Sequence, residues 1–142
     1  MTLKMPPAIW FWIVTVLLLL WNLAGLAEFL TEVFAPDLIV ETLDDEQREI
    51  FNNRPNWYIY NFAVAVFAGT LSCIMLLARK KLAVSLAVLS LIAVLISSGY
   101  NVYAGAMENA TTANLVLFVL VIAIDILLVA FSVYASKRRW IA

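Results

Sequence analysis

The amino-acid sequence predicts an all-α fold, a single polytopic membrane domain built as a bundle of four transmembrane helices. The chain has 142 residues, of which 65% are hydrophobic and only 13% charged, a balance far from that of a soluble domain. Four stretches are apolar over the roughly 20 residues that a helix needs to cross a lipid bilayer. None of them alternates apolar and polar residues as a barrel strand does, so their backbones must be satisfied within helices.

The four spans belong to one domain, residues 1–142. We place them at residues 8–30, 57–78, 82–104 and 114–135. The first span has features of a secretory signal, because Lys4 precedes it and small residues lie near 25–27. It is longer than the roughly 7 to 15 apolar residues of a signal, however. It also carries Trp10, Trp12 and Trp21, which favour a retained helix with anchors at the membrane interface.

The distribution of lysine and arginine predicts the orientation. One side of the predicted bundle receives Lys4, the turn RKK at 79–81 and the tail KRR at 137–139, whereas the other receives Arg48 and Arg54. Short loops rich in these residues stay in the cytoplasm. We therefore expect both termini to be cytoplasmic.

The outer loop, residues 31–55, is strongly acidic. Its carboxylates are Glu32, Asp37, Glu41, Asp44, Asp45, Glu46 and Glu49. Asp44 followed three residues later by Gln47 has the pattern of a helix start, and Ile50 and Phe51 fall on one side of that helix. We expect a short surface helix here. Its acids are interpreted as a solvated face, as charge runs usually are, with a cation funnel or a partner site as the alternative.

Small and polar residues fall on one face of each span, because steps of 7 and 11 residues return to nearly the same direction of a helix. The stripes are Thr15, Asn22 and Gly25; Asn61, Ala65, Ala68, Gly69 and Ser72; Ser90, Ser97 and Asn101; and Asn114, Asp125, Ser132 and Ser136. Close packing explains most of them, since small residues let backbones approach and amides and hydroxyls bond across helices.

Asp125 is harder to explain by packing. It lies near the middle of the fourth span, where an aspartate costs about 2.5 to 3.5 kcal/mol on insertion scales. No lysine or arginine lies within any span, so we expect the neutral acid, hydrogen-bonded to a partner such as Thr15, Asn22, Ser72 or Ser90. Three roles remain open: a hydrogen bond within the bundle, a contact with another chain, or the carriage of a proton or cation.

The candidate intramembrane site consists of Asp125, Asn22, Glu28, Asn61 and Asn101. Glu28 lies closer to the outer surface and is expected to line a polar mouth. The other residues expected at this mouth are Asn61, Asn101, Tyr58, Tyr60, Tyr100 and Tyr103. Asp125 lies below this mouth. Together these residues predict a pocket that narrows inward and takes a small polar solute or a cation.

The residue inventory argues against an enzyme. The chain has no histidine and a single cysteine, Cys73, which excludes an internal disulfide and a CxxC motif. It has no glycine-rich phosphate loop and no clustered metal ligands, so we expect no metal and no cofactor. The basic runs are explained as cytoplasmic anchors, and no nucleic-acid partner is expected.

Three segments resemble a family of small four-helix bacterial inner-membrane proteins: LWNLAGLAEFL at 20–30, NFAVAVFAGTLSCIMLLARKK at 61–81 and SKRRWIA at 136–142. The resemblance covers nearly the whole chain in layout. It implies a bacterial inner-membrane location. Members are generally uncharacterised and sometimes carry the label "sugar transporter", and no catalytic or ligand-binding residue is carried over from them. The middle of their last helix is usually apolar, so Asp125 departs from the family pattern.

Two functions follow as hypotheses. The first is non-enzymatic binding or transport of a small solute or cation, in a homo-oligomer because four short helices enclose little volume. The second is an accessory or scaffold subunit that packs against another membrane protein. An Asp125 stripe facing outward favours the second, whereas an inward stripe with a water-accessible mouth at Glu28 favours the first.

Overall fold

The fold was obtained as a computed structural model, which describes residues 5–104 and 112–142 except for the side chains of Gln47 and Asn114. These residues form helices and no strand. In chain order the helices are α1 (Ile9–Phe34), α2 (Pro36–Val40), α3 (Asp45–Asn52), α4 (Asn56–Leu77), α5 (Leu82–Tyr103) and α6 (Thr112–Lys137).

The predicted all-α bundle is confirmed. Helices α1, α4, α5 and α6 are long and apolar enough to cross a membrane, and the chain is a multi-pass membrane protein. The short helix expected in the first outer loop is α3, which begins at Asp45, directly after Asp44. Lys4 and the side chains of Gln47 and Asn114 lie outside the described residues.

The segment between the first two long helices is more helical than the sequence indicated. Helix α1 continues to Phe34, four residues past the predicted end of the span at 30, and α2 follows at once. Pro36 causes the break, because the residue before a proline is excluded from helical geometry and proline itself suits the first turn of a new helix. Ala35 accordingly has φ −143° and ψ 57°.

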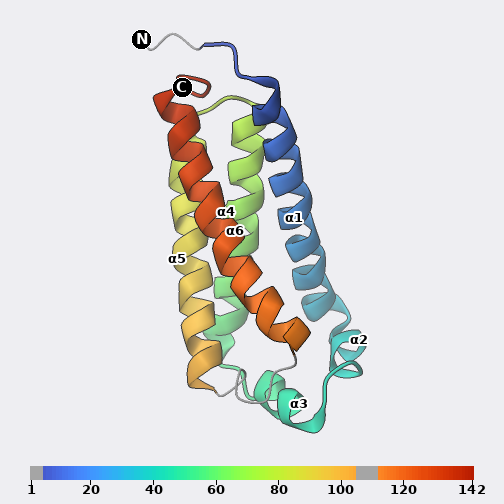
Figure 1. The fold of residues 1–142 in the computed structure, drawn as a ribbon. Coiled ribbons are helices and arrows are strands. Elements are labelled where there is room, and N and C mark those ends of the chain that lie inside the picture. The colour runs from blue at the N-terminus through green and yellow to red at the C-terminus, as the bar shows by residue number, and fades with distance from the viewer. Residues whose placement is uncertain (1–4, 105–111) are drawn as a thin grey trace.

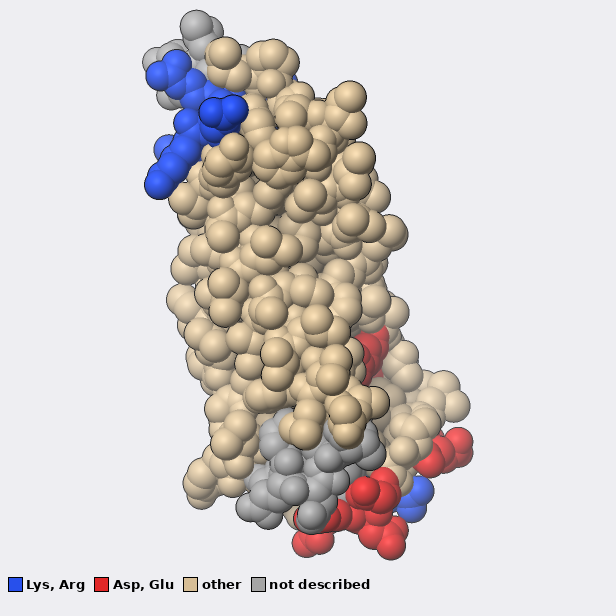
Figure 2. Space-filling model, in the orientation of Figure 1, with Lys and Arg blue, Asp and Glu red and all other residues tan. Residues whose placement is uncertain are grey.

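The four long helices run side by side, with both termini at one end and α2 and α3 at the other (Figure 1). Helix α4 packs between α1 and α5, and α5 packs against α6. Figure 2 shows basic side chains gathered at the end with the termini and acidic ones at the opposite end. We call these the basic end and the acidic end, and the halves of the bundle next to them the basic half and the acidic half.

Helices α4 and α6 end in the same backbone motif at the basic end. Arg79 and Arg139 both have φ 59°, and the next residue in each case closes a wide turn: Lys80 N–H donates to the Met75 carbonyl, and Trp140 N–H to the carbonyl five residues earlier. This is the Schellman arrangement, in which glycine usually occupies the left-handed position. The basic runs therefore terminate both helices as well as carrying charge.

The last residues of the chain fold back and close the basic end. The Arg79 side chain donates from Nε to the Trp140 carbonyl at 2.8 Å and from Nη2 to the Met5 carbonyl. Lys81 N–H donates to the Ala142 carbonyl at 3.0 Å. The Arg79 guanidinium and the Lys81 amide thus join the α4–α5 turn to both ends of the chain, and they satisfy backbone carbonyls that would otherwise lack a donor.

The packed core lies in the basic half. Phe11 is fully buried there, with its ring 5.6 Å from Phe131 in a stacked arrangement and 5.6 Å from Trp140 edge to face. Trp10 adds a second contact to Phe131, at 5.9 Å. These rings join α1 to α6 and to the tail, so the basic half is filled by side chains.

Candidate functional site

A cavity of about 470 Å³ lies among the four long helices in the acidic half. Every long helix contributes polar groups to it: Asn22 and Glu28 from α1, Tyr58 from α4, Ser90 from α5 and Asp125 from α6. Aromatic and aliphatic side chains fill the rest of the wall. A largely apolar wall with a few converging polar groups is the usual make-up of a small-molecule site.

The floor of the cavity is built around Asp125, which is only 6% exposed. Ser90 Oγ lies 3.2 and 3.3 Å from the two Asp125 carboxyl oxygens and 2.8 Å from the Ala65 carbonyl oxygen. A hydroxyl has one proton to donate, so Ser90 can donate to the Ala65 carbonyl or to Asp125, but not to both at once. With that proton on Ala65, the Ser90 lone pairs can accept from a neutral Asp125; with it turned toward Asp125, Ser90 donates to a carboxylate.

Asn22 completes the floor from the opposite side. Its Nδ2 donates to the Leu18 carbonyl at 2.8 Å and to Cys73 Sγ at 3.6 Å. Gly69 on α4 makes this approach possible, since a Cβ at that position would lie 2.1 Å from Asn22 Oδ1 and 3.1 Å from Ser90 Oγ. The absence of a side chain at Gly69 therefore lets α1, α4 and α5 bring polar atoms to one level of the bundle.

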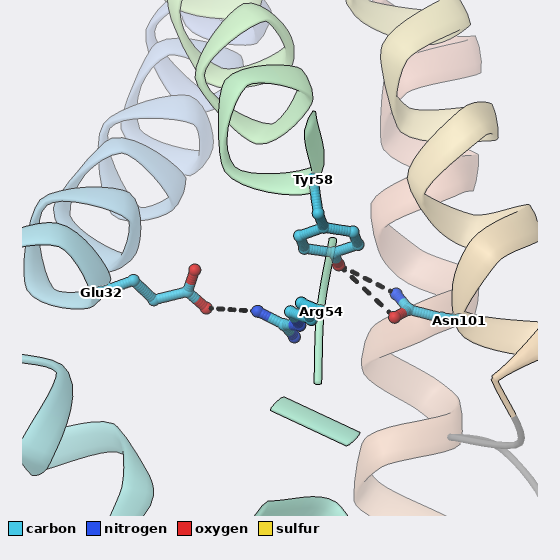
Figure 3. A network of polar contacts seen from close by, with 4 residues as sticks. All are labelled: Glu32, Arg54, Tyr58 and Asn101. Atoms are coloured by element: carbon cyan, nitrogen blue, oxygen red, sulfur yellow. Dashed lines mark hydrogen bonds and ion pairs between the residues drawn. The ribbon is translucent and has the colours of Figure 1, made fainter. Parts of the chain in front are cut away.

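A second polar network lies nearer the acidic end and is built around Arg54. Arg54 Nη1 pairs with Glu32 Oε1 at 3.3 Å, and its guanidinium carbon lies 4.3 Å from the centre of the Tyr58 ring. Tyr58 and Asn101 exchange hydrogen bonds at 3.2 and 3.4 Å between the phenol oxygen and the amide. Figure 3 shows Arg54 between Glu32 and Tyr58, so the network connects α1, the loop, α4 and α5.

This network is largely withdrawn from the surface. The Glu32 side chain is 7% exposed and that of Arg54 is 24% exposed. Buried ion pairs need such extra contacts, because desolvation offsets much of their attraction. The face of Tyr58 and the ring of Phe51, 4.7 Å from the guanidinium carbon, supply them. Both partners of the ion pair line the cavity.

Four of the five residues singled out in the sequence, Asn22, Glu28, Asn101 and Asp125, line this one cavity. Glu28 is exposed, and no lysine or arginine pairs with it among the described residues. Asn61 takes a different position. Its Nδ2 donates to the Ala93 carbonyl at 2.7 Å and to Ser97 Oγ, so it ties α4 to α5 behind the wall that Ser97 forms.

Sequence reasoning missed the pair of Glu32 and Arg54, which it assigned to the solvated loop. A signal for it exists. Glu32 lies four residues after Glu28, on the same side of a continuing helix, and Arg54 directly precedes the proline that opens α4. The error came from ending the first span at residue 30, which left Glu32 in a loop.

The described carboxyl groups that line the cavity come from α1 and α6. Across residues 5–104 and 112–142, no three histidine, cysteine, aspartate or glutamate side chains form a group that could hold a metal ion. Comparison of the chain with models of known protein families, with curated proteins and with solved structures finds no match.

Proposed function

We propose that this protein binds a small polar solute or cation in the cavity of its acidic half and carries it across the membrane without enzymatic chemistry. The observation that carries the proposal is the placement of Asp125. This costly mid-membrane carboxyl lies 6% exposed in the wall of a four-helix cavity, opposite Ser90. An intramembrane acid that faces such a cavity marks a pathway for ions or solutes more often than a contact with lipid.

The proposal includes the location. The basic residues at the end that holds both termini favour a cytoplasmic basic end, and the resemblance to small bacterial proteins favours the inner membrane of a bacterium. The acidic half, with the cavity and Glu28, then faces outward. Because side chains fill the basic half, this conformation corresponds to an outward-facing state. Passage of the solute then requires the contact between α1 and α6 at Phe11 and Phe131 to open.

A homo-oligomer is part of the proposal. Four helices bury few of their side chains, and most large apolar residues of α1, α4, α5 and α6 remain exposed to lipid or to another copy. The alternative function is an accessory or scaffold subunit for another membrane protein. In that case Asp125 and Ser90 serve only to hold α5 and α6 together.

The test is a flux measurement. The purified protein is placed in liposomes that contain a pH-sensitive dye, and proton and monovalent-cation gradients are imposed on the native chain and on Asp125→Asn. Glu49→Gln is the matched control, because Glu49 is exposed on α3 and does not line the cavity. We expect flux above that of empty liposomes for the native chain and the control, and its loss in Asp125→Asn.

Circular dichroism and gel filtration establish that the variants keep their fold and oligomeric state. Equal flux with and without the Asp125 carboxyl would reject Asp125 as the carrier. No flux beyond empty liposomes under any of the gradients would favour the accessory-subunit function instead.

A further inference from the structure

We propose that the ligand of the cavity is a monovalent organic cation, an ammonium group on an apolar body, which binds in exchange for the proton of Asp125. This inference rests on the proposed function and narrows it to one class of ligand. Size, charge and the chemistry of the cavity wall each support it.

The size of the cavity exceeds what an inorganic ion needs. Its volume is about 470 Å³, whereas a water molecule occupies roughly 30 Å³ of liquid. Cavities of roughly 300 to 1,000 Å³ suit organic molecules of drug size. A bare proton path or a single metal ion would leave most of this space unused.

The charge of the cavity favours a cation. Among the described residues, four charged side chains line it, and two of them, Glu32 and Arg54, form an ion pair. The remaining two are the carboxyls of Glu28, near the acidic end, and Asp125, at the floor. One carboxyl attracts a cation at the entrance and the other receives it in a site of low dielectric, where the attraction between opposite charges is strong.

The wall offers the aromatic faces that ammonium groups prefer. Trp21, Phe62 and Phe118 all line the cavity. The protein already places one cation of its own in a similar setting, since the Arg54 guanidinium lies over the Tyr58 ring and against the Glu32 carboxylate. Aromatic side chains and a carboxyl line the same cavity, so the same combination is available to a ligand there.

The arrangement at Ser90 explains the exchange for a proton. With its proton on the Ala65 carbonyl, Ser90 accepts a hydrogen bond from a protonated Asp125, and with that proton turned to Asp125 it donates to a carboxylate, so Ser90 suits both forms. An arriving ammonium group replaces that proton as the counter-charge, Asp125 becomes a carboxylate, and the proton leaves to water. Of the described titratable groups, Cys73 on α4 lies near Asp125 and Glu28 on α1 lines the same cavity, while α5 presents the Ser90 hydroxyl.

The experiment measures binding of benzyltrimethylammonium to the purified protein in a non-ionic maltoside detergent by isothermal titration calorimetry. Benzenesulfonate is the anionic probe of similar size, and glucose is the neutral polar probe. We expect the cation alone to bind. Titrations in two buffers with different ionisation enthalpies report the protons released, and we expect a release of up to about one proton per cation bound.

Variants assign the site. Asp125→Asn should weaken cation binding about tenfold or more, and Glu28→Gln only about two- to threefold because its charge is screened by solvent. Glu49→Gln should leave binding unchanged. If Asp125→Asn fails to fold, Val94→Phe provides a second test, since it fills the cavity from α5 without changing any charge and should also abolish binding.

The outcomes separate this inference from the proposed function. Proton flux that depends on Asp125, without binding of benzyltrimethylammonium, would overturn the assignment of an organic cation as the ligand. It would leave the proposed function standing. That assignment is also overturned if benzenesulfonate or glucose binds instead of benzyltrimethylammonium, or if cation binding survives both Asp125→Asn and Val94→Phe. Absence of both flux and benzyltrimethylammonium binding in the native chain would overturn both proposals.

The ammonium group has two natural sources, a free amine or the headgroup of a lipid. Repeating the titration in nanodiscs of phosphatidylglycerol alone and of phosphatidylglycerol mixed with phosphatidylethanolamine distinguishes them. Competition by phosphatidylethanolamine would support the ammonium site and assign it to a lipid headgroup. Equal binding in the two nanodiscs would support the site and assign it to a free amine.

Discussion

The basic half and the acidic half of this bundle are made from the same four helices but treat the space between them differently. In the basic half, α1 and α6 meet through aromatic rings, with Phe11 fully buried against Phe131 and Trp140. In the acidic half the same two helices border a cavity of about 470 Å³. In the basic half the rings of α1 and α6 pack against each other, whereas in the acidic half polar groups and the rings of Trp21, Phe62 and Phe118 line the wall without filling the space between the helices.

An arginine in each half shows the same contrast. Arg79 donates to the backbone carbonyls of Trp140 and Met5, and so joins chain segments at the basic end. Arg54 instead pairs with the Glu32 carboxylate and lies over the Tyr58 ring, leaving both partners in the cavity wall. Arg79 therefore joins backbone segments at a filled end of the bundle, whereas Arg54 joins side chains that border the cavity.

The largest expected effect tests the aromatic contact of the basic half. Phe11→Ala should lower the free energy of unfolding by about 3 kcal/mol, because it leaves an unfilled hole in the packed core. Phe118→Ala, in the cavity wall, should cost less than about 1 kcal/mol, since it only widens existing space. Unfolding in mixtures of dodecyl sulfate and maltoside, followed by tryptophan fluorescence, measures both. Equal costs would contradict the contrast between the halves.

The next effect concerns Gly69, at the level where the basic half meets the floor of the cavity. Gly69→Ala should destabilise the bundle by about 2 kcal/mol, because its Cβ would overlap the Asn22 side chain. Gly99→Ala is the matched control on α5, where an added Cβ meets nothing within 4 Å. The control should be neutral or slightly stabilising. The same unfolding assay compares them, and an unaffected Gly69→Ala would show that Asn22 can move without cost.

A smaller effect is expected at Arg54. Arg54→Gln should lower the free energy of unfolding by about 1 kcal/mol, because it leaves the Glu32 carboxylate, 7% exposed, without its ion-pair partner. Asp45→Asn breaks the exposed pair between Asp45 and Arg48 and should cost less than about 0.5 kcal/mol. Hydrogen exchange of the loop amides before α4 reports the change directly. Equal protection in the two variants would contradict a structural role for the Arg54 network.

The smallest effect compares two buried serines. Ser90→Ala should cost about 0.6 kcal/mol, a typical value for a hydrogen bond between membrane helices. Ser132→Ala should cost nothing, since within the described residues its fully buried hydroxyl has no hydrogen-bond partner. The unfolding assay separates them only with replicate measurements. A larger loss in Ser132→Ala would reveal a partner for that hydroxyl and weaken the contrast with the cavity floor.

The predicted spans agree with the helices of the structure to within a few residues at most ends. At the start of the second span, for example, Trp57 was expected and Asn56 begins α4. The largest difference, at the end of α1, arose because Glu32 was read as a loop residue. The stripe containing Asp125 was predicted from the helical period alone. That the stripe points into the bundle could be established only from the helices packed around α6. Ser90 was one of four partners considered for Asp125, and only packing selected it.

The sequence by itself determined the membrane-spanning helices, the charge difference between the two ends and the alignment of polar residues on each helix, because these depend on composition and on a 3.6-residue period. The tertiary structure decided how those stripes meet. It turned Asn61 toward α5, joined Glu32 to Arg54 across 22 positions of the chain and left space above Asp125. Such contacts depend on helix crossing and side-chain volume, which no local pattern encodes.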